Sequence, residues 1–261
     1  MPRFAANLTM LFTERPFPER FAAARAAGFR FVEYLFPYGY PAEELRRLLA
    51  DNGLAQVLFN LPCGDWAAGD RGIAADPGRV AEFRAGIPLA VIYAKALGVP
   101  RLNCLAGKLP PGVAEAEAFD VLVENLAHAA DVLAGEGIEL VVEAINHFDI
   151  PGFVLSRTSQ VMALLDAVAR PNVAMQYDVY HAQRQEGELA ATLAANIGRI
   201  GHIQIADNPG RHQPGTGEIN FPFLFEWIDR LGYDGCIGLE YLPDPDTEAS
   251  LAWVAAMGLR L

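Results

Sequence analysis

Four short apolar stretches in the second half of the chain each end on a residue whose side chain can bind a metal ion. Successive end residues are separated by roughly 30 residues, the length of one strand-plus-helix unit. If the stretches are successive parallel strands, their ends meet at one edge of the sheet, and three carboxylates converge there with one amide oxygen. The four end residues are Glu143, Asp178, Gln204 and Glu240.

This combination of side chains indicates a metal site. Three carboxylates in an apolar site repel one another, and they stay ionised together only if a cation holds them. Oxygen ligands suit a hard divalent ion, so we expect Mg²⁺ or Mn²⁺. Taken singly, each residue has an ordinary explanation, such as a surface glutamate, a helix cap at Asp178 or a buried core amide at Gln204. Their joint position at one end of a sheet favours a shared site.

Four further residues lie close to these strand ends in the sequence. His181 follows Asp178 by three residues and can reach a substrate oxygen, or it is an ordinary loop histidine. His202 shares strand-face parity with Gln204, so it either orients that amide or faces a cavity. Asp149 and Arg211 are predicted in loops, where a guanidinium can bind a substrate carboxylate bidentately.

Strand-like and helix-like segments alternate along the whole chain. Apolar, aromatic and β-branched runs predict eight strands, at residues 4–10, 29–36, 54–60, 101–105, 140–143, 173–178, 200–204 and 236–240. Helical periodicity, often closed by a glycine, predicts eight helices, at residues 18–27, 42–52, 79–97, 114–134, 159–168, 186–196, 221–231 and 248–257.

Eight β/α units predict an α/β protein with a single (β/α)₈ TIM barrel over residues 1–261, because strict alternation produces a parallel sheet. An open doubly wound sheet usually has a glycine-rich phosphate-binding turn after its first strand. The corresponding turn, residues 7–12, contains no glycine, so we expect no nucleotide cofactor. Active sites of TIM barrels lie at the carboxyl ends of the strands, where the four residues fall.

Composition excludes several classes of partner. The net charge of −12 and an isoelectric point near 4.8 argue against a nucleic-acid surface or an anionic membrane. No apolar run is long enough to span a bilayer without interruption. Three widely spaced cysteines do not form a disulfide framework, which favours the cytoplasm. A small-molecule substrate is the expected partner, and a homo-oligomer is compatible with this composition.

Several motifs, spread nearly end to end, resemble the hydroxypyruvate isomerase family of xylose-isomerase-like TIM barrels. The resemblance implies reversible isomerisation of the small hydroxy-keto acid hydroxypyruvate to 2-hydroxy-3-oxopropanoate, with Glu143 and Glu240 as the catalytic pair. The matching segments are residues 1–8, 11–14, 32–38, 143–146, 149–153, 202–207 and 217–220.

Related sugar epimerases imply the remaining roles. By this likeness Glu143, Asp178, Gln204 and Glu240 are the metal ligands, and His181 and Arg211 contact the substrate. The epimerases commonly have histidine where this chain has Gln204, and the harder amide oxygen favours Mg²⁺ or Mn²⁺ over zinc. The family also includes isomerases of related keto-acids such as 2-oxo-tetronate.

Interconversion of a ketone and a neighbouring aldehyde moves a proton between adjacent carbons through an enediolate, which suits a Lewis-acid metal and two carboxylates. Three alternatives are a ketose 3-epimerase, a metal-dependent phosphodiesterase of the endonuclease IV type and a non-catalytic scaffold. The phosphodiesterase calls for a histidine-rich site and a basic groove, whereas this chain has five histidines and a charge of −12.

Overall fold

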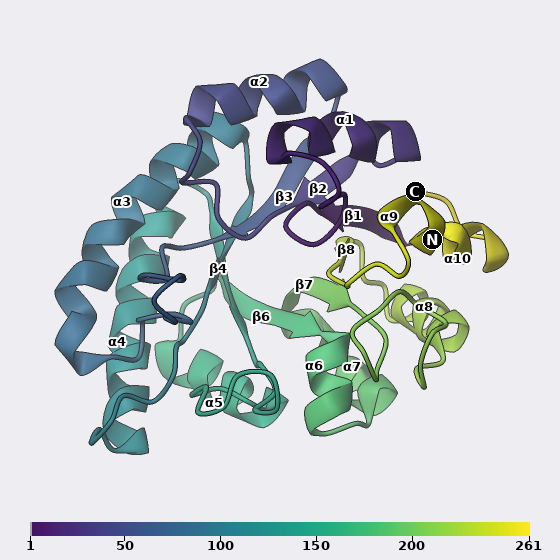
Figure 1. Ribbon diagram of the computed structural model, residues 1–261. Helices are drawn as coiled ribbons and strands as arrows, with labels where there is room; N and C mark the ends of the chain where they lie inside the picture. Colours follow the sequence, from purple (N-terminus) through teal and green to yellow (C-terminus); the bar gives the residue numbers. More distant parts are fainter. Residues whose placement is uncertain (1) are drawn as a thin grey trace.

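The computed structural model describes residues 2–261, so Met1, which begins the first matching segment, lies outside the described residues. Eight parallel strands close into a barrel in chain order (Figure 1), which confirms the predicted (β/α)₈ fold. The strands are β1 (Arg3–Asn7), β2 (Phe31–Glu33), β3 (Ala55–Asn60), β4 (Arg101–Cys104), β5 (Glu139–Glu143), β6 (Val173–Asp178), β7 (Ile200–Ile205) and β8 (Cys236–Leu239).

Helices surround the barrel (Figure 1) and bury the main apolar core against its outer face. No helix within residues 2–261 has the length and hydropathy that a membrane span requires. The long helices are α1 (Phe17–Ala27), α2 (Ala42–Asn52), α3 (Val80–Leu97), α4 (Glu115–Ala134), α5 (Thr158–Val168), α7 (Leu189–Asn196) and α8 (Phe221–Arg230).

The predicted helix set was wrong at two places. A short helix, α6 (Val179–Gln185), follows β6 directly, where a loop was expected. Asp178 starts it, because its carboxylate accepts the backbone N–H of Tyr180 at 2.8 Å. Seven residues are too few to produce a recognisable apolar period. The predicted C-terminal helix is two pieces, α9 (Thr247–Ser250) and α10 (Ala252–Ala256).

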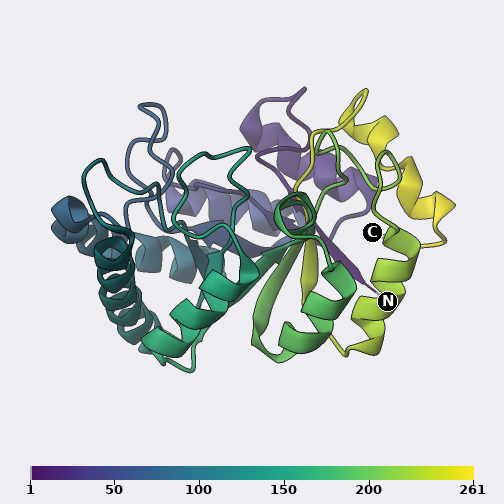
Figure 2. The ribbon, with the colours of Figure 1, turned by 90° about the horizontal axis from the view of Figure 1, so that it is seen from below.

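Alternate residues of each strand point into the barrel. Successive inward residues along the strands therefore form layers across the interior, and two of these layers bear on the site. The lower layer is a small apolar cluster that includes Ala5, Leu58, Val141, Ala174 and Cys236. Two positions further along each strand, the inward residues have polar side chains, except in β8, where a glycine has no side chain. At the same end, the longer connections extend away from the barrel (Figure 2). The polar layer consists of Asn7, Glu33, Asn60, Asn103, Glu143, Gln176, Gln204 and, in β8, Gly238.

Gly238 leaves room for a buried carboxylate in this layer. An ideal Cβ at Gly238 would lie 2.4 Å from Glu33 Oε1 and 2.5 Å from Oε2, well inside van der Waals contact. The Glu33 carboxylate cannot easily move aside, because it accepts hydrogen bonds from Asn7, His202 and Gln204. The missing side chain in β8 therefore determines where the carboxylate of β2 can lie.

We expect Gly238→Ala to destabilise the protein by about 1–3 kcal/mol, the usual range for overpacking a well-packed interior. Urea denaturation gives this free energy of unfolding. Gly198→Ala is the matched control, since a Cβ there has no neighbour within 4 Å and the change should be close to neutral. Equal free energies of unfolding for the two variants would show that the Glu33 carboxylate moves aside at no cost in stability.

Candidate active site

A cavity of about 690 Å³ opens at the carboxyl ends of the strands. Its floor is the polar layer, and its walls come from the connections that follow the strands. Residues distant in sequence meet there because the strands are parallel, so the last inward-pointing residues of all the strands lie at the same height in the barrel. Among the lining residues are Glu143, Gln204 and Glu240 of the predicted metal set, together with His181, Asp149 and Arg211.

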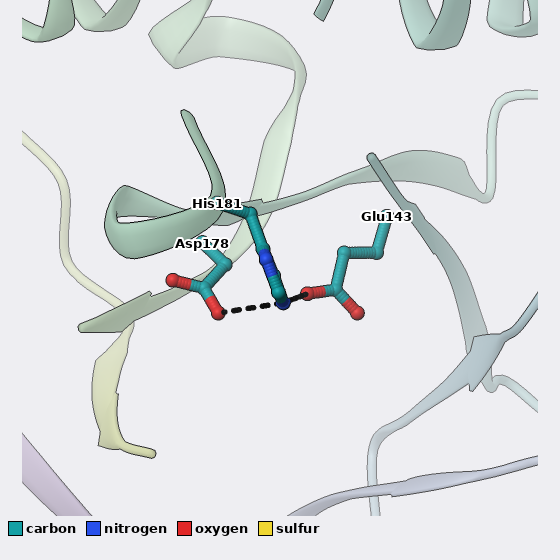
Figure 3. A group of neighbouring side chains, drawn as sticks. All are labelled: Glu143, Asp178 and His181. Atoms are coloured by element: carbon teal, nitrogen blue, oxygen red, sulfur yellow. Dashed lines mark ion pairs between the residues drawn. The ribbon is translucent and has the colours of Figure 1, made fainter. Parts of the chain in front are cut away.

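Glu143, Asp178 and His181 form the tightest cluster of metal-type side chains in the described part of the chain, with ligand atoms all within 4.8 Å of one another. Figure 3 shows the imidazole between the two carboxylates. His181 Nε2 lies 3.8 Å from Glu143 Oε1 and 3.6 Å from Asp178 Oδ2. All three are buried, so no bulk water separates them.

Asn146 determines which ring nitrogen of His181 carries the proton. Its Oδ1 accepts the backbone N–H groups of Phe148 and Asp149, which fixes the orientation of the amide. Its Nδ2 must therefore donate to His181 Nδ1, 2.6 Å away, and to Asp149 Oδ2. With Nδ1 as acceptor, the ring proton of neutral His181 is on Nε2, facing the two carboxylates. In this tautomer His181 is a hydrogen-bond donor to the cavity.

Arg211 brings positive charge to the other side of the cluster. Its Nη2 donates to Glu240 Oε2 at 2.7 Å and lies 3.7 Å from Asp178 Oδ2. Glu240 comes one residue after β8, while Arg211 comes from the connection between β7 and α8. The guanidinium also stacks over Tyr180, 5.1 Å from the ring centroid. One cation thus serves two carboxylates from β6 and β8, the strands on either side of β7.

The protonation of the cluster follows from burial. Burial raises the pKa of Glu143 well above its usual range, and the negative charges of Glu240 and Asp178 raise it further. Burial raises the pKa of Glu240 to about 8, although Arg211 acts to lower it. Burial also raises the pKa of Asp178 and lowers that of His181 well below the usual value. His181 is therefore neutral at neutral pH, and the carboxyl groups compete for protons.

Gln204 is held by hydrogen bonds at both ends of its amide. Its Nε2 donates to Glu33 Oε1 at 2.7 Å, and its Oε1 accepts from Gln176 Nε2 at 2.6 Å. Gln176 Nε2 also donates to Glu143 Oε2 at 3.0 Å. Because Glu33 takes the amide nitrogen, the amide oxygen of Gln204 is directed toward the side of the cavity where Glu143 lies.

The structure places the remaining two predicted residues differently. Asp149 lines the cavity, accepts from Asn146 and lies 3.6 Å from Arg184. His202 is fully buried below the cavity and is not among its lining residues. Its Nε2 lies 2.7 Å from Glu33 Oε2. Of the two roles considered for His202, this position favours support of the polar layer over contact with substrate.

Four residues of the site were not singled out from the sequence. Gln176 carries a detectable signal, since it is a polar residue at inward parity in the apolar strand β6. Asn146, Arg71 and Arg184 come from connections or from α6, where no period relates one residue to the next. The spatial neighbours of such residues follow only from the closed barrel.

The donor set fits a divalent ion. Glu143 Oε1 and Asp178 Oδ2 are buried and have no hydrogen-bond partner among residues 2–261, although unpaired buried carboxylate oxygens are unfavourable. Gln204 and Glu240 line the cavity beside Glu143, while Asp178 lies behind its wall and is not among the lining residues. One oxygen of Glu143 and one of Asp178 lie within 4.8 Å of each other, close enough to bind one ion, with His181 beside them.

Comparisons with known proteins identify the family of this chain. A family model for the xylose isomerase-like TIM barrel matches residues 21–257. Hydroxypyruvate isomerase of Escherichia coli (strain K12) is 53% identical over 254 residues, which span 97% of this chain and 98% of the relative. 2-oxo-tetronate isomerase of Cupriavidus necator is 50% identical, with the same shares of each chain.

One solved structure is also similar over nearly its full length. The Brucella melitensis protein described as AP endonuclease, family 2, is 45% identical, has a TM-score of 0.96 and matches over 98% of this chain and 99% of its own. These matches cover nearly the whole length of the chain. The chain therefore belongs to the hydroxypyruvate isomerase family of xylose isomerase-like TIM barrels.

Proposed function

We propose that this protein is a hydroxypyruvate isomerase, which interconverts hydroxypyruvate and 2-hydroxy-3-oxopropanoate. The observation that carries the proposal is the pair of buried carboxyl groups, Glu143 and Glu240, in one cavity and close enough for each charge to act on the other. They come from β5 and from the end of β8, three strands apart in the closed order, so they approach a bound substrate from different walls.

The chemistry is a proton shift between adjacent carbons. One carboxylate removes a proton from C3 of hydroxypyruvate, and the electron pair forms the C2–C3 double bond while the C2 oxygen takes up negative charge. The other, protonated carboxyl group delivers a proton to C2. The C3 hydroxyl loses its proton as the aldehyde forms, and the C2 oxygen gains one, so atoms and charge balance. A pair of carboxyl groups that shares one proton suits these two roles.

His181 and Arg211 are the proposed contacts at the reacting end of the substrate. The Nε2–H of His181 faces the cavity and can donate to the C2 oxygen as its charge grows. Arg211 keeps Glu240 oriented and offsets part of the negative charge of the cluster. Asp149 acts through Asn146, because it accepts from the amide that sets the tautomer of His181. His202 positions Gln204 through their common partner Glu33.

Glu143, Asp178, Gln204 and Glu240 are the proposed ligands of Mg²⁺ or Mn²⁺, and His181 stays a donor because its proton is on Nε2. The two buried oxygens without partners support this choice of residues. A divalent ion bound there supplies Lewis-acid stabilisation of negative charge on the substrate oxygens. The absence of a net redox change means that the reaction needs no nicotinamide or flavin.

A longer keto-acid is the second candidate substrate. The relative named 2-oxo-tetronate isomerase is nearly as similar as the hydroxypyruvate isomerase, and a cavity of about 690 Å³ has room for the additional carbon. NMR-monitored turnover of both acids, with DNA containing abasic sites as a third substrate, separates these activities. The net charge of −12 favours the acids over DNA.

Metal binding should stabilise the protein more at pH 8 than at pH 5. The pKa of Glu240 rises from 4.5 to about 8 on folding, so between these values the folded state holds a proton that the unfolded state releases. The free energy of unfolding of the metal-free protein therefore falls as pH rises through this window. A divalent ion replaces the proton and removes the loss. Tm in EDTA and in Mn²⁺, measured at both pH values, checks the sign.

The matched control for this experiment is Glu226→Gln on the exposed face of α8, which should behave as wild type. Glu240→Gln should lose much of the pH dependence in EDTA. An equal Tm increase from Mn²⁺ at both pH values would contradict the assignment of the cluster as the metal site.

Glu143→Gln and Glu240→Gln should each lower kcat for hydroxypyruvate by about 10² to 10⁴-fold, the usual contribution of general acid–base catalysis. Glutamine keeps the size of the side chain but cannot accept or return the proton. With the wild-type enzyme in D₂O, the carbon that receives the proton should acquire deuterium, as seen by NMR. Glu226→Gln is again the control. Wild-type rates in both site variants would refute the two-carboxylate mechanism.

A further inference from the structure

Arg71 brings a second guanidinium to the cavity, from the long connection between β3 and α3. The guanidinium lies over the ring of Trp66, 4.0 Å from its centroid. Its Nη1 donates to the backbone oxygens of Trp66 and Asp70 at 3.2 and 2.6 Å. Nε and Nη2 have no hydrogen-bond partner within residues 2–261, and no carboxylate of that range pairs with Arg71.

The other arginines that line the cavity already have acidic partners. Arg211 is bound to Glu240 and lies near Asp178. Arg184 lies 3.6 Å from Asp149 and donates to the Tyr180 hydroxyl. Of the three arginines in the cavity wall, Arg71 therefore has the positive charge that is least compensated by the protein. The sequence suggested Arg211 for a substrate carboxylate, and in the structure the Arg211 guanidinium is already paired with Glu240 and close to Asp178.

Packing and hydrogen bonds on both sides of Arg71 fix the conformation of the segment that carries it. Gly72 has φ +110°, and a Cβ there would lie 2.2 Å from Leu105 O, so only glycine lets the connection run against the residues that follow β4. Gly72 and Ala106 form an isolated antiparallel bridge. On the other side of Arg71, the Asp70 carboxylate accepts from Asp65 N and from Arg79 Nη1, each at 2.7 Å. Arg71 is thus pre-positioned, and little conformational entropy is lost when it binds a ligand.

The barrel order sets the direction from which Arg71 acts. β3 and β7 are four strands apart in a closed barrel of eight, so their connections lie on opposite sides of the mouth. Arg211 follows β7 and Arg71 follows β3. A substrate whose reacting carbons lie at Glu143 and Glu240 can extend its unreactive end across the mouth toward Arg71.

We propose that Arg71 binds the carboxylate of the hydroxy-keto acid and thereby selects acids over neutral sugars. Nε–H and Nη2–H form one edge of the guanidinium, and both are free for a bidentate pair with two carboxylate oxygens. Trp66 holds the plane of the guanidinium from its face. This assignment rests on the proposed function, since it names the part of that substrate which Arg71 recognises.

The first test measures binding without turnover. D-glycerate keeps the carboxylate and the C3 hydroxyl of hydroxypyruvate but has a hydroxyl in place of the C2 carbonyl, so it cannot undergo the isomerisation. In calorimetric titrations with Mg²⁺ present, Arg71→Met should raise the Kd of D-glycerate by roughly 10- to 100-fold, the usual effect of losing hydrogen bonds to a charged group. Arg71→Lys should recover only part of the affinity, because an ammonium cannot form the bidentate pair.

Arg184→Met is the matched control, since it removes a cavity arginine that already has Asp149 as partner, and we expect a clearly smaller loss of affinity. An equal loss in Arg184→Met would overturn the proposal in favour of a general charge effect at the mouth. Unchanged affinity in Arg71→Met, with a wild-type circular dichroism spectrum, would overturn it too, as would wild-type protein that does not bind D-glycerate.

The second test is kinetic. Arg71→Met should raise KM for hydroxypyruvate by a similar factor and leave kcat nearly unchanged, because the carboxylate takes no part in the proton shift. A fall in kcat with unchanged KM would overturn the binding role.

The proposed function and the proposed role of Arg71 can be refuted independently of each other. Wild-type protein that binds D-glycerate through Arg71 but does not isomerise hydroxypyruvate would refute the function alone, whereas normal turnover by Arg71→Met with unchanged KM would refute this inference alone.

Discussion

The structure depends on one electrostatic constraint, the convergence of the buried carboxyl groups of Glu143, Asp178 and Glu240 at the floor of the cavity. Their charges repel, and burial penalises each ionised form, so the pKa of every member rises. Arg211 offsets part of this repulsion through its contacts with Glu240 and Asp178. A bound divalent ion would offset more of it.

The polar layer beneath this cluster gives the charges their geometry. Glu33 accepts from three side chains, and this set of bonds orients the amide of Gln204. Gln176 then links Gln204 to Glu143. Buried polar groups are tolerated when they are hydrogen-bonded to one another, which explains how a barrel interior can be apolar at one level and polar two residues higher.

Charge is divided between the two halves of the cavity. Around β5 to β8 the acidic residues and Arg211 compensate one another, and His181 adds a neutral donor whose tautomer Asn146 sets. Across the mouth, Arg71 stacks on Trp66 and donates from Nη1 to backbone oxygens. Its Nε and Nη2 atoms have no hydrogen-bond partner within residues 2–261. An anionic substrate with a reactive ketone at one end matches this division better than a neutral sugar does.

The sequence by itself determined the barrel and the strand-end positions of its main acidic residues. Alternating segments of about 30 residues leave few topologies other than a parallel barrel, and strand ends in such a barrel share one level. Strand periodicity is a local property of the chain, so it is enough to bring Glu143, Asp178, Gln204 and Glu240 to the same end of the barrel.

Only the tertiary structure decided which atoms of these residues meet. The start of α6 at Asp178 turns His181 into the cavity, and an amide orientation set by two backbone N–H groups gives its ring a donor at Nε2. Arg211 faces Glu240, and Arg71 reaches the cavity from the opposite side. Connections have no period from which such contacts can be read, since their paths depend on packing against segments distant in sequence, such as Gly72 against Leu105.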